Sequence, residues 1–207
     1  MKKNEKILKE VLERVEPPEE DLKKIKNYVH EFSEKIKVGL KKHKINADIF
    51  VGGSLAKGTV IKKGNYDADV FIRYDKKYKN EEISALTNKI LGQNKNISII
   101  HGSRDYFRIK YGENFFIELI PVKKINNPKE YENITDLSYL HVKYINKKIK
   151  SKKMLDDIKV AKAFCYANGC YGAESYIHGF SGYSLELLVY YYGGFTPFIK
   201  AMTGVGK

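Results

Sequence analysis

A glycine-rich turn followed by two closely spaced aspartates gives the first chemical signal in this sequence. The turn reads Gly52-Gly53-Ser54, and the aspartates are Asp67 and Asp69, with the apolar residues 70–72 directly after them. The apolar run predicts a strand, and side chains two residues apart on a strand point to the same side of a sheet. The two carboxylates therefore converge, which suits a divalent metal beside a phosphate and favours nucleotidyl transfer.

The glycine turn itself predicts a phosphate site. A Gly52-Gly53 turn followed by Ser54 at a helix start exposes backbone N–H groups, and these groups and the helix dipole bind anions. The hydroxyl of Ser54 and the ammonium of Lys57 can add contacts to the same triphosphate. An ordinary serine-capped turn also explains these residues, and the aspartate pair downstream is what favours the phosphate site.

A third acidic residue stands out because its surroundings are apolar. Glu118 lies within the run 114–121, Asn-Phe-Phe-Ile-Glu-Leu-Ile-Pro. An unpaired buried charge costs several kcal/mol, so this carboxylate needs a metal, a partner or solvent. A metal shared with Asp67 and Asp69 completes the three-carboxylate set of two-metal phosphoryl transfer. The alternative is that Glu118 faces water or a lysine.

Polar residues farther along the chain are candidates for the rest of a nucleotide pocket. Ser138 and His141 are three residues apart and share one face of a predicted helix. Lys162 and Tyr171 follow later. Each has an ordinary alternative: a capping hydroxyl, a surface histidine, a solvated lysine and a core tyrosine.

Apolar patterning predicts the elements that position these residues. Strands are expected at 46–51, 68–74, 97–101, 105–110 and 114–121, with a helix at 80–92. Two helices separated by Pro17-Pro18 precede them, and helices at 137–149, 152–168 and 182–192 follow. The fold class is therefore α+β, a mixed sheet with helices packed on it. The change from strands to helices along the chain places a domain boundary near 130–136.

Composition limits the partners and the setting. The chain of 207 residues has 38 Lys+Arg against 25 Asp+Glu, a formal charge of +13. This surplus favours a polyanion such as RNA, DNA or anionic lipid, although solvated lysine-rich faces also explain it. No run approaches the ~18 apolar residues of a membrane span, so no membrane is expected. Cys165 and Cys170 do not make a zinc site, and free thiols in a cytoplasmic protein are expected.

The motifs resemble those of a known family. The segment Gly53-Ser54-Leu55-Ala56-Lys57-Gly58-Thr59 with Asp67-Ala68-Asp69-Val70-Phe71 resembles the nucleotidyltransferase motif of the polymerase-beta superfamily. Within that superfamily the chain resembles the archaeal (class I) CCA-adding enzymes. Two segments resemble the helical neck of those enzymes. They are residues 167–174, Ala-Asn-Gly-Cys-Tyr-Gly-Ala-Glu, and residues 178–188, His-Gly-Phe-Ser-Gly-Tyr-Ser-Leu-Glu-Leu-Leu.

The resemblance implies a specific activity. It implies a head domain at 1–135 and a helical neck at 136–207. It implies two Mg²⁺ ions, replaceable by Mn²⁺, and addition of C, C and A to tRNA 3′ ends from CTP and ATP. The implied metal ligands are Asp67, Asp69 and Glu118. The implied nucleotide-binding residues are Gly53, Ser54, Lys57, Ser138, His141, Lys162 and Tyr171.

Several positions depart from the family pattern. Lys57 and His178 stand where the family usually has arginine, and Glu118 stands where it usually has aspartate. A glutamate reaches about one methylene farther, which shifts the metal slightly. Family members also continue into body and tail domains that hold the tRNA. The sequence is therefore expected to be a minimal enzyme, a piece of a longer protein, or half of a split enzyme whose partner chain supplies those domains.

Two alternatives to tRNA processing stay open. A related nucleotidyltransferase can make oligoadenylate, a cyclic nucleotide or a nucleotidylated protein, and the neck segments argue against these products. An inactive RNA-binding module is the other alternative, although all three acidic positions are filled.

Overall fold

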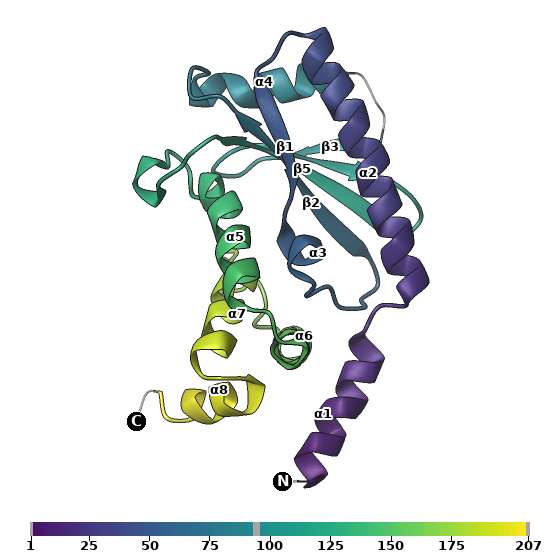
Figure 1. Ribbon diagram of the computed structural model, residues 1–207, viewed down its shortest axis with the longest axis vertical. Coiled ribbons are helices and arrows are strands. Elements are labelled where there is room, and N and C mark those ends of the chain that lie inside the picture. The colour runs from purple at the N-terminus through teal and green to yellow at the C-terminus, as the bar shows by residue number, and fades with distance from the viewer. Residues whose placement is uncertain (1, 93–95, 206–207) are drawn as a thin grey trace. The chain divides into compact units, whose positions relative to one another are not determined.

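This computed structural model describes residues 2–92 and 96–205 and contains a five-stranded mixed sheet. The strands are β1 (Ala47–Val51), β2 (Tyr66–Tyr74), β3 (Ile97–Ile100), β4 (Tyr106–Lys110) and β5 (Phe115–Lys123). Their order across the sheet is β1-β2-β5-β4-β3 (Figure 1). β2 and β5 pair in parallel, and the other neighbours pair antiparallel.

Helices precede, interrupt and follow the sheet. They are α1 (Lys2–Val15), α2 (Glu19–Lys42), α3 (Gly53–Lys57), α4 (Asn80–Leu91), α5 (Ser138–Lys148), α6 (Lys152–Ala167), α7 (Gly182–Tyr191) and α8 (Phe195–Met202). Short 3₁₀ helices lie at Pro128–Glu130 and Ile134–Leu137. The predicted α+β class, with a mixed sheet followed by helices, is confirmed. None of the helices in the described ranges is long and apolar enough to cross a bilayer.

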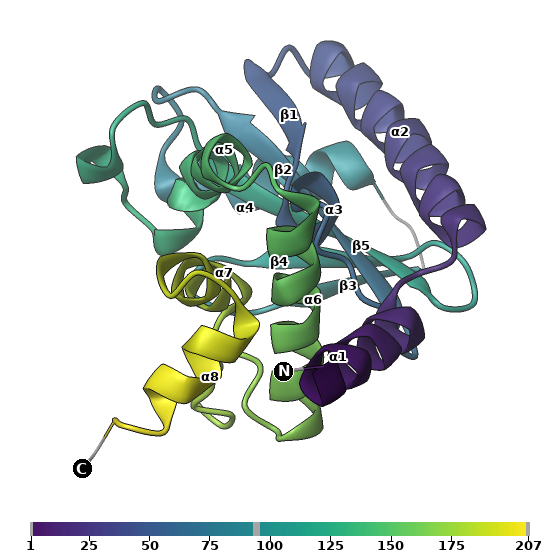
Figure 2. The ribbon, with the colours of Figure 1, turned by 60° about the horizontal axis from the view of Figure 1, so that its bottom comes forward.

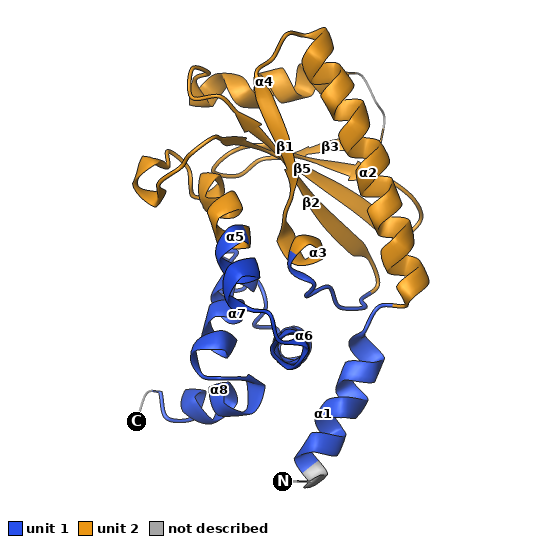
Figure 3. Cartoon of the chain, viewed as in Figure 1, with its two compact units in different colours: residues 1–17, 57–63, 143–207 blue, residues 18–56, 64–142 orange. Residues whose placement is uncertain are grey.

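The chain folds into two compact units, each built from segments that are distant in sequence (Figure 3). Unit 1 contains residues 1–17, 57–63 and 143–207. Unit 2 contains residues 18–56 and 64–142. The division at 135/136 stays a prediction about domains, because the compact units are not continuous stretches of chain.

In unit 2, α2 and α4 cover one face of the sheet (Figures 1 and 2). Alternate residues of β2, including Val70 and Ile72, point into the core that this face forms with α2 residues such as Val29 and Phe32. The period of two then directs the intervening residues of β2 to the opposite face. Phe71 packs there in a smaller cluster, so this second face is the one that carries the aspartates.

Unit 1 is held by a separate helical core. Ile158 and Cys165 of α6 pack with Leu185 of α7 and Phe198 of α8 in one buried cluster. α1 joins this unit through its contact with α6, where Nζ of Lys159 lies 2.9 Å from a carboxylate oxygen of Glu16, just after α1. Both cysteines are free thiols, as predicted.

Two local features differ from the sequence-based expectation. β5 continues past Pro121 to Lys123, because its pairing with β4 ends at Leu119 and, within the described residues, no strand pairs with it on that side at position 121. α8 was not predicted. Pro197 lies in its first turn, where a missing N–H leaves no helical hydrogen bond unmade.

A buried ion pair fixes the segment between β5 and α5. Arg104 and Asp136 are 2% and 0% exposed, and an Nη1–Oδ1 distance of 2.5 Å joins them. The backbone N–H groups of Lys123 and Asn133 also donate to Asp136. Burial by itself would raise the pKa of this carboxyl, but the Arg104 guanidinium and these N–H groups together hold its pKa below the ordinary 3.8.

This depressed pKa predicts acid-sensitive stability. The unfolded state takes up a proton at Asp136 before the folded state does, so the stabilisation is complete above the unfolded pKa and is lost as pH falls through the folded pKa. We expect the free energy of unfolding of the wild type to fall more steeply between about pH 5 and pH 2 than that of Asp136→Asn. Urea denaturation at several pH values in this range measures the free energy of unfolding. Asp105→Asn, a partly exposed control, should follow the wild type, and parallel profiles for all three proteins would contradict the assignment.

Candidate active site

The turn after β1 lies directly against one of the two aspartates. The N–H of Gly52 donates to the backbone carbonyl of Asp69 at 2.8 Å. Gly53 has φ +56, and a Cβ at this position would lie 1.6 Å from Oδ2 of Asp69. Any side chain at position 53 would therefore displace the carboxylate. The second glycine of the turn is required both by its backbone conformation and by this close approach.

Strand pairing brings the third carboxylate beside the first two. Asp67 and Asp69 lie two residues apart on β2 and face the same side of the sheet. In the parallel pairing of β2 with β5, Glu118 is the register partner of Asp69. Neighbouring strands lie about 4.8 Å apart. The three predicted metal ligands therefore occupy adjacent positions on one sheet face, and the side chains of Asp67 and Glu118 are 25% and 24% exposed.

The structure adds Arg108, which the sequence motifs do not indicate. Arg108 lies on β4 directly opposite Glu118, and its Nη2 donates to Oδ1 of Asp67 at 3.2 Å. Its Nε lies 3.8 Å from Oε1 of Glu118. Arg108 alternates with the buried Phe107 and Ile109, so strand periodicity could have assigned its face. Only the register of β4 with β5 could have placed it among these carboxylates.

The carboxylates of Asp67, Asp69 and Glu118 are chemically suited to bind a divalent cation. Within residues 2–92 and 96–205, no three His, Cys, Asp or Glu side chains gather closely enough to form a metal site in the protein as it stands. The assignment of Asp67, Asp69 and Glu118 as metal ligands stays a prediction. Carboxylate oxygens are nevertheless the preferred ligands of Mg²⁺. A cationic group, the guanidinium of Arg108, already lies beside Asp67 and Glu118.

The predicted triphosphate ligands fall in different environments. Ser54 lies in the first turn of the short helix α3, in unit 2. Lys57 belongs to unit 1, where its Nζ lies 2.7 Å from Oε2 of Glu186. The side chains of this pair are only 8% and 1% exposed, and the hydroxyl of Thr59 donates to the other oxygen of Glu186 at 3.1 Å. Lys57 is thus part of a buried ion pair, and its role toward a triphosphate stays a prediction.

The downstream polar residues form two pairs. Ser138 and His141 lie on α5 in unit 2, three residues apart as predicted. Lys162 and Tyr171 lie in unit 1, with Nζ of Lys162 5.7 Å from the ring centroid of Tyr171. Lys162 is buried and donates to the backbone carbonyl of Thr59 at 2.8 Å. Their roles in nucleotide binding stay predictions.

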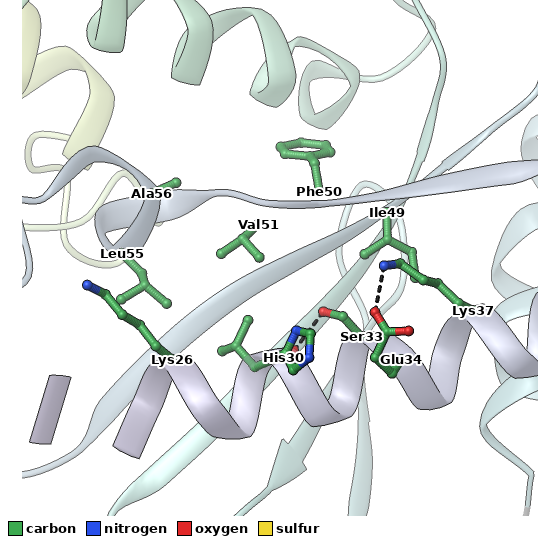
Figure 4. A pocket seen from close by; sticks show the side chains of 11 residues that line it. Lys26, His30, Ser33, Glu34, Lys37, Ile49, Phe50, Val51, Leu55 and Ala56 are labelled. Atoms are coloured by element: carbon green, nitrogen blue, oxygen red, sulfur yellow. Dashed lines mark hydrogen bonds and ion pairs between the residues drawn. The ribbon is translucent and has the colours of Figure 1, made fainter. Parts of the chain in front are cut away.

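A groove of about 340 Å³ runs beside the edge strand β1, between α2, β1 and α3 (Figure 4). Lys26, His30 and Phe50 are among the residues that line it, and the ten predicted site residues are not. The groove is therefore distinct from the carboxylate face of the sheet.

Two families match overlapping parts of the chain. Residues 33–165 match the family described as the nucleotidyltransferase domain, which is more than half of the sequence. Residues 156–206 match the second domain of tRNA nucleotidyltransferase. The second match covers α7, α8 and most of α6, whereas α5 lies outside it.

Curated relatives carry one name. The chain is 43% identical over 157 residues to the CCA-adding enzyme of Nanoarchaeum equitans, covering 75% of this chain and 38% of that protein. It is 28% identical over 207 residues to the CCA-adding enzyme of Archaeoglobus fulgidus, covering 96% and 43%. The chain thus spans about two fifths of the length of these relatives. The predicted resemblance to the head and neck of archaeal CCA-adding enzymes is confirmed.

Solved structures share the fold at low sequence identity. Escherichia coli MS115-1 CdnC with ATP superposes with a TM-score of 0.70 at 15% identity, covering 95% of this chain and 69% of that one. Cid1, an RNA terminal uridylyl transferase, superposes with a TM-score of 0.63 at 16% identity, covering 93% and 53%. These likenesses show a shared fold. The match over residues 33–165 shows that the chain belongs to the nucleotidyltransferase domain family.

Proposed function

We propose that this chain is the catalytic head and neck of a cytoplasmic tRNA nucleotidyltransferase that adds C, C and A to tRNA 3′ ends from CTP and ATP. The observation that carries the proposal is the match of residues 156–206 to the second domain of tRNA nucleotidyltransferase. The curated relatives named CCA-adding enzymes support the same product. The surplus of positive charge suits an RNA substrate.

Each part of the site has a proposed task. Asp67, Asp69 and Glu118 hold two Mg²⁺ ions, or Mn²⁺ in their place. When bound, these ions lower the pKa of the attacking 3′-hydroxyl and stabilise the leaving pyrophosphate. The backbone N–H groups of the Gly53 turn and the hydroxyl of Ser54 bind the triphosphate.

The remaining proposed contacts orient the nucleotide. Lys57 adds positive charge for the triphosphate, while Ser138, His141, Lys162 and Tyr171 contact the sugar and phosphates of the incoming nucleotide. Phosphoryl transfer requires mainly position and charge from the protein, so these residues act by holding the reacting groups in line. We propose that body and tail domains hold the rest of the tRNA and that, in a split enzyme, a separate chain supplies them.

The test is nucleotide incorporation with defined tRNA ends. The protein is incubated with tRNA lacking CCA and with tRNA ending in CC, each with one labelled nucleotide and Mg²⁺. We expect CTP on the first substrate, ATP on the second, and no incorporation in EDTA. A parallel reaction contains candidate chains that carry tRNA-binding domains. Oligomers or cyclic products formed from ATP without tRNA, or no incorporation with any chain present, would contradict the proposal.

A further inference from the structure

The carboxylate face carries a cation of its own, and neither the sequence motifs nor the proposed mechanism uses it. Arg108 reaches from β4 across β5 to Asp67 on β2, and it passes Glu118 on the way. Its guanidinium therefore lies over β5, the strand between β4 and β2. Three neighbouring carboxylates repel one another, and a guanidinium between two of them reduces this repulsion.

We propose that Arg108 is a positioning residue that acts as an internal counter-cation, holding Asp67 and Glu118 in the metal-free protein and competing with divalent metal for them. This inference rests on the proposed function, because it concerns the same carboxylates. A divalent ion such as Mg²⁺ approaches carboxylate oxygens to about 2.1 Å. The ion pair of Arg108 with Asp67 is 3.2 Å long, so a metal on the same oxygen would lie close to the guanidinium and be repelled by it.

The interactions of Arg108 with Asp67 and Glu118 are weak enough for a metal ion to displace the guanidinium. Its Nε is buried without a hydrogen-bond partner, and the 3.8 Å contact with Glu118 is longer than a hydrogen bond. The side chain of Arg108 is also 39% exposed, so solvent weakens both ion pairs. Arrival of a metal therefore does not have to break a deeply buried pair.

Phe116 offers the guanidinium a second position. The Cζ atom of Arg108 lies 4.2 Å from the ring centroid of Phe116, within the range of a cation–π contact. Phe116 is the register partner of Asp67 and faces the same side of the sheet. Arg108 can thus give up Asp67 and remain on the ring, which keeps it at the edge of the site instead of releasing it into solvent.

Metal affinity of the whole chain distinguishes competition from a purely structural role. Mn²⁺ binding without nucleotide or RNA is measured by electron paramagnetic resonance for the wild type, Arg108→Met, Arg108→Lys and Lys110→Met. Lys110 is the matched control, since it is exposed on the same strand and face but is the register partner of Phe116 and not of a carboxylate. Thermal unfolding in EDTA is measured for the same four proteins.

We expect Arg108→Met to bind Mn²⁺ about 3- to 10-fold more tightly than the wild type at 0.1 M salt, because a repelling charge is removed. Its unfolding midpoint in EDTA should fall by a few degrees, because the carboxylates then lose the compensating charge of Arg108. Arg108→Lys and Lys110→Met should bind Mn²⁺ within about twofold of the wild type.

An Arg108→Met dissociation constant equal to or weaker than that of the wild type overturns competition, and so does an equal effect of Lys110→Met. If the wild type itself shows no saturable Mn²⁺ binding, the metal site of the proposed function fails together with this inference. Failure of the proposed function is thus distinguishable from failure of the Arg108 assignment alone. If Arg108→Met does not fold, Arg108→Gln takes its place, because it also removes the positive charge and should tighten Mn²⁺ binding by the same factor.

Discussion

Asp69→Ala is expected to lower nucleotide incorporation by at least about a thousandfold while leaving the fold intact. A thousandfold loss corresponds to about 4 kcal/mol of transition-state stabilisation, a reasonable share for a residue that holds catalytic metal. Asp69 lies where the glycine turn meets the paired strands: Gly52 donates to its backbone, and Glu118 is its register partner. Incorporation of labelled CTP by tRNA lacking CCA measures the effect.

The control for Asp69→Ala is an acidic residue of the same unit outside the carboxylate face. Asp105 is 37% exposed and pairs with His101 at 3.0 Å, so Asp105→Ala should keep its activity within about twofold. Circular dichroism and the thermal midpoint of both variants show whether the fold is retained. A folded Asp69→Ala protein with undiminished incorporation would remove the basis for the proposed active site.

Lys57→Met is expected to lower the free energy of unfolding by about 3–5 kcal/mol, because it leaves a buried carboxylate without its cation. Glu186 is 1% exposed and would keep only the hydroxyl of Thr59 as a partner among the contacts described above. A loss of this size is a large fraction of the 5–15 kcal/mol that stabilises a typical domain. Urea denaturation followed by circular dichroism measures it.

Three further variants separate loss of the ion pair from loss of a lysine. Lys62→Met removes an exposed charge from the same segment and should change stability by no more than about 0.5 kcal/mol. Lys57→Arg keeps the charge and should be much milder than Lys57→Met. The double variant Lys57→Met/Glu186→Gln should recover part of the loss, because the uncompensated charge is gone. If Lys57→Met is as stable as Lys62→Met, the pair does not stabilise unit 1.

Local sequence patterns were sufficient for most of the elements. The five predicted strands and the helices at 80–92, 137–149, 152–168 and 182–192 are found within about two residues of the expected bounds. β2 begins at Tyr66, two residues before the predicted start, and therefore includes both aspartates. Elements of this kind can be predicted because residues close in sequence set their periodicity. α8 was missed because Pro197 argues against a helix unless the first turn is known to begin just before it.

Only part of the site could be predicted from local sequence patterns. The shared direction of Asp67 and Asp69 follows from strand periodicity alone. The requirement for Gly53 was suggested by its type, but its cause, contact with the carboxylate of Asp69, appears only in the folded chain. Lys57 was assigned to a triphosphate from the motif, and the structure pairs it with Glu186, 129 residues later. Long-range contacts of this kind have no local signature.

The sequence by itself determined the α+β class, the strand that carries two carboxylates on one side, and the glycine turn that precedes it. The tertiary structure decided which residues join them. Glu118 lies beside Asp69 because β5 pairs with β2 in one particular register, and Arg108 reaches the same face because β4 pairs with β5. The physical reason is that side-chain direction depends on a two-residue period within a strand, whereas strand register depends on packing between segments distant in sequence.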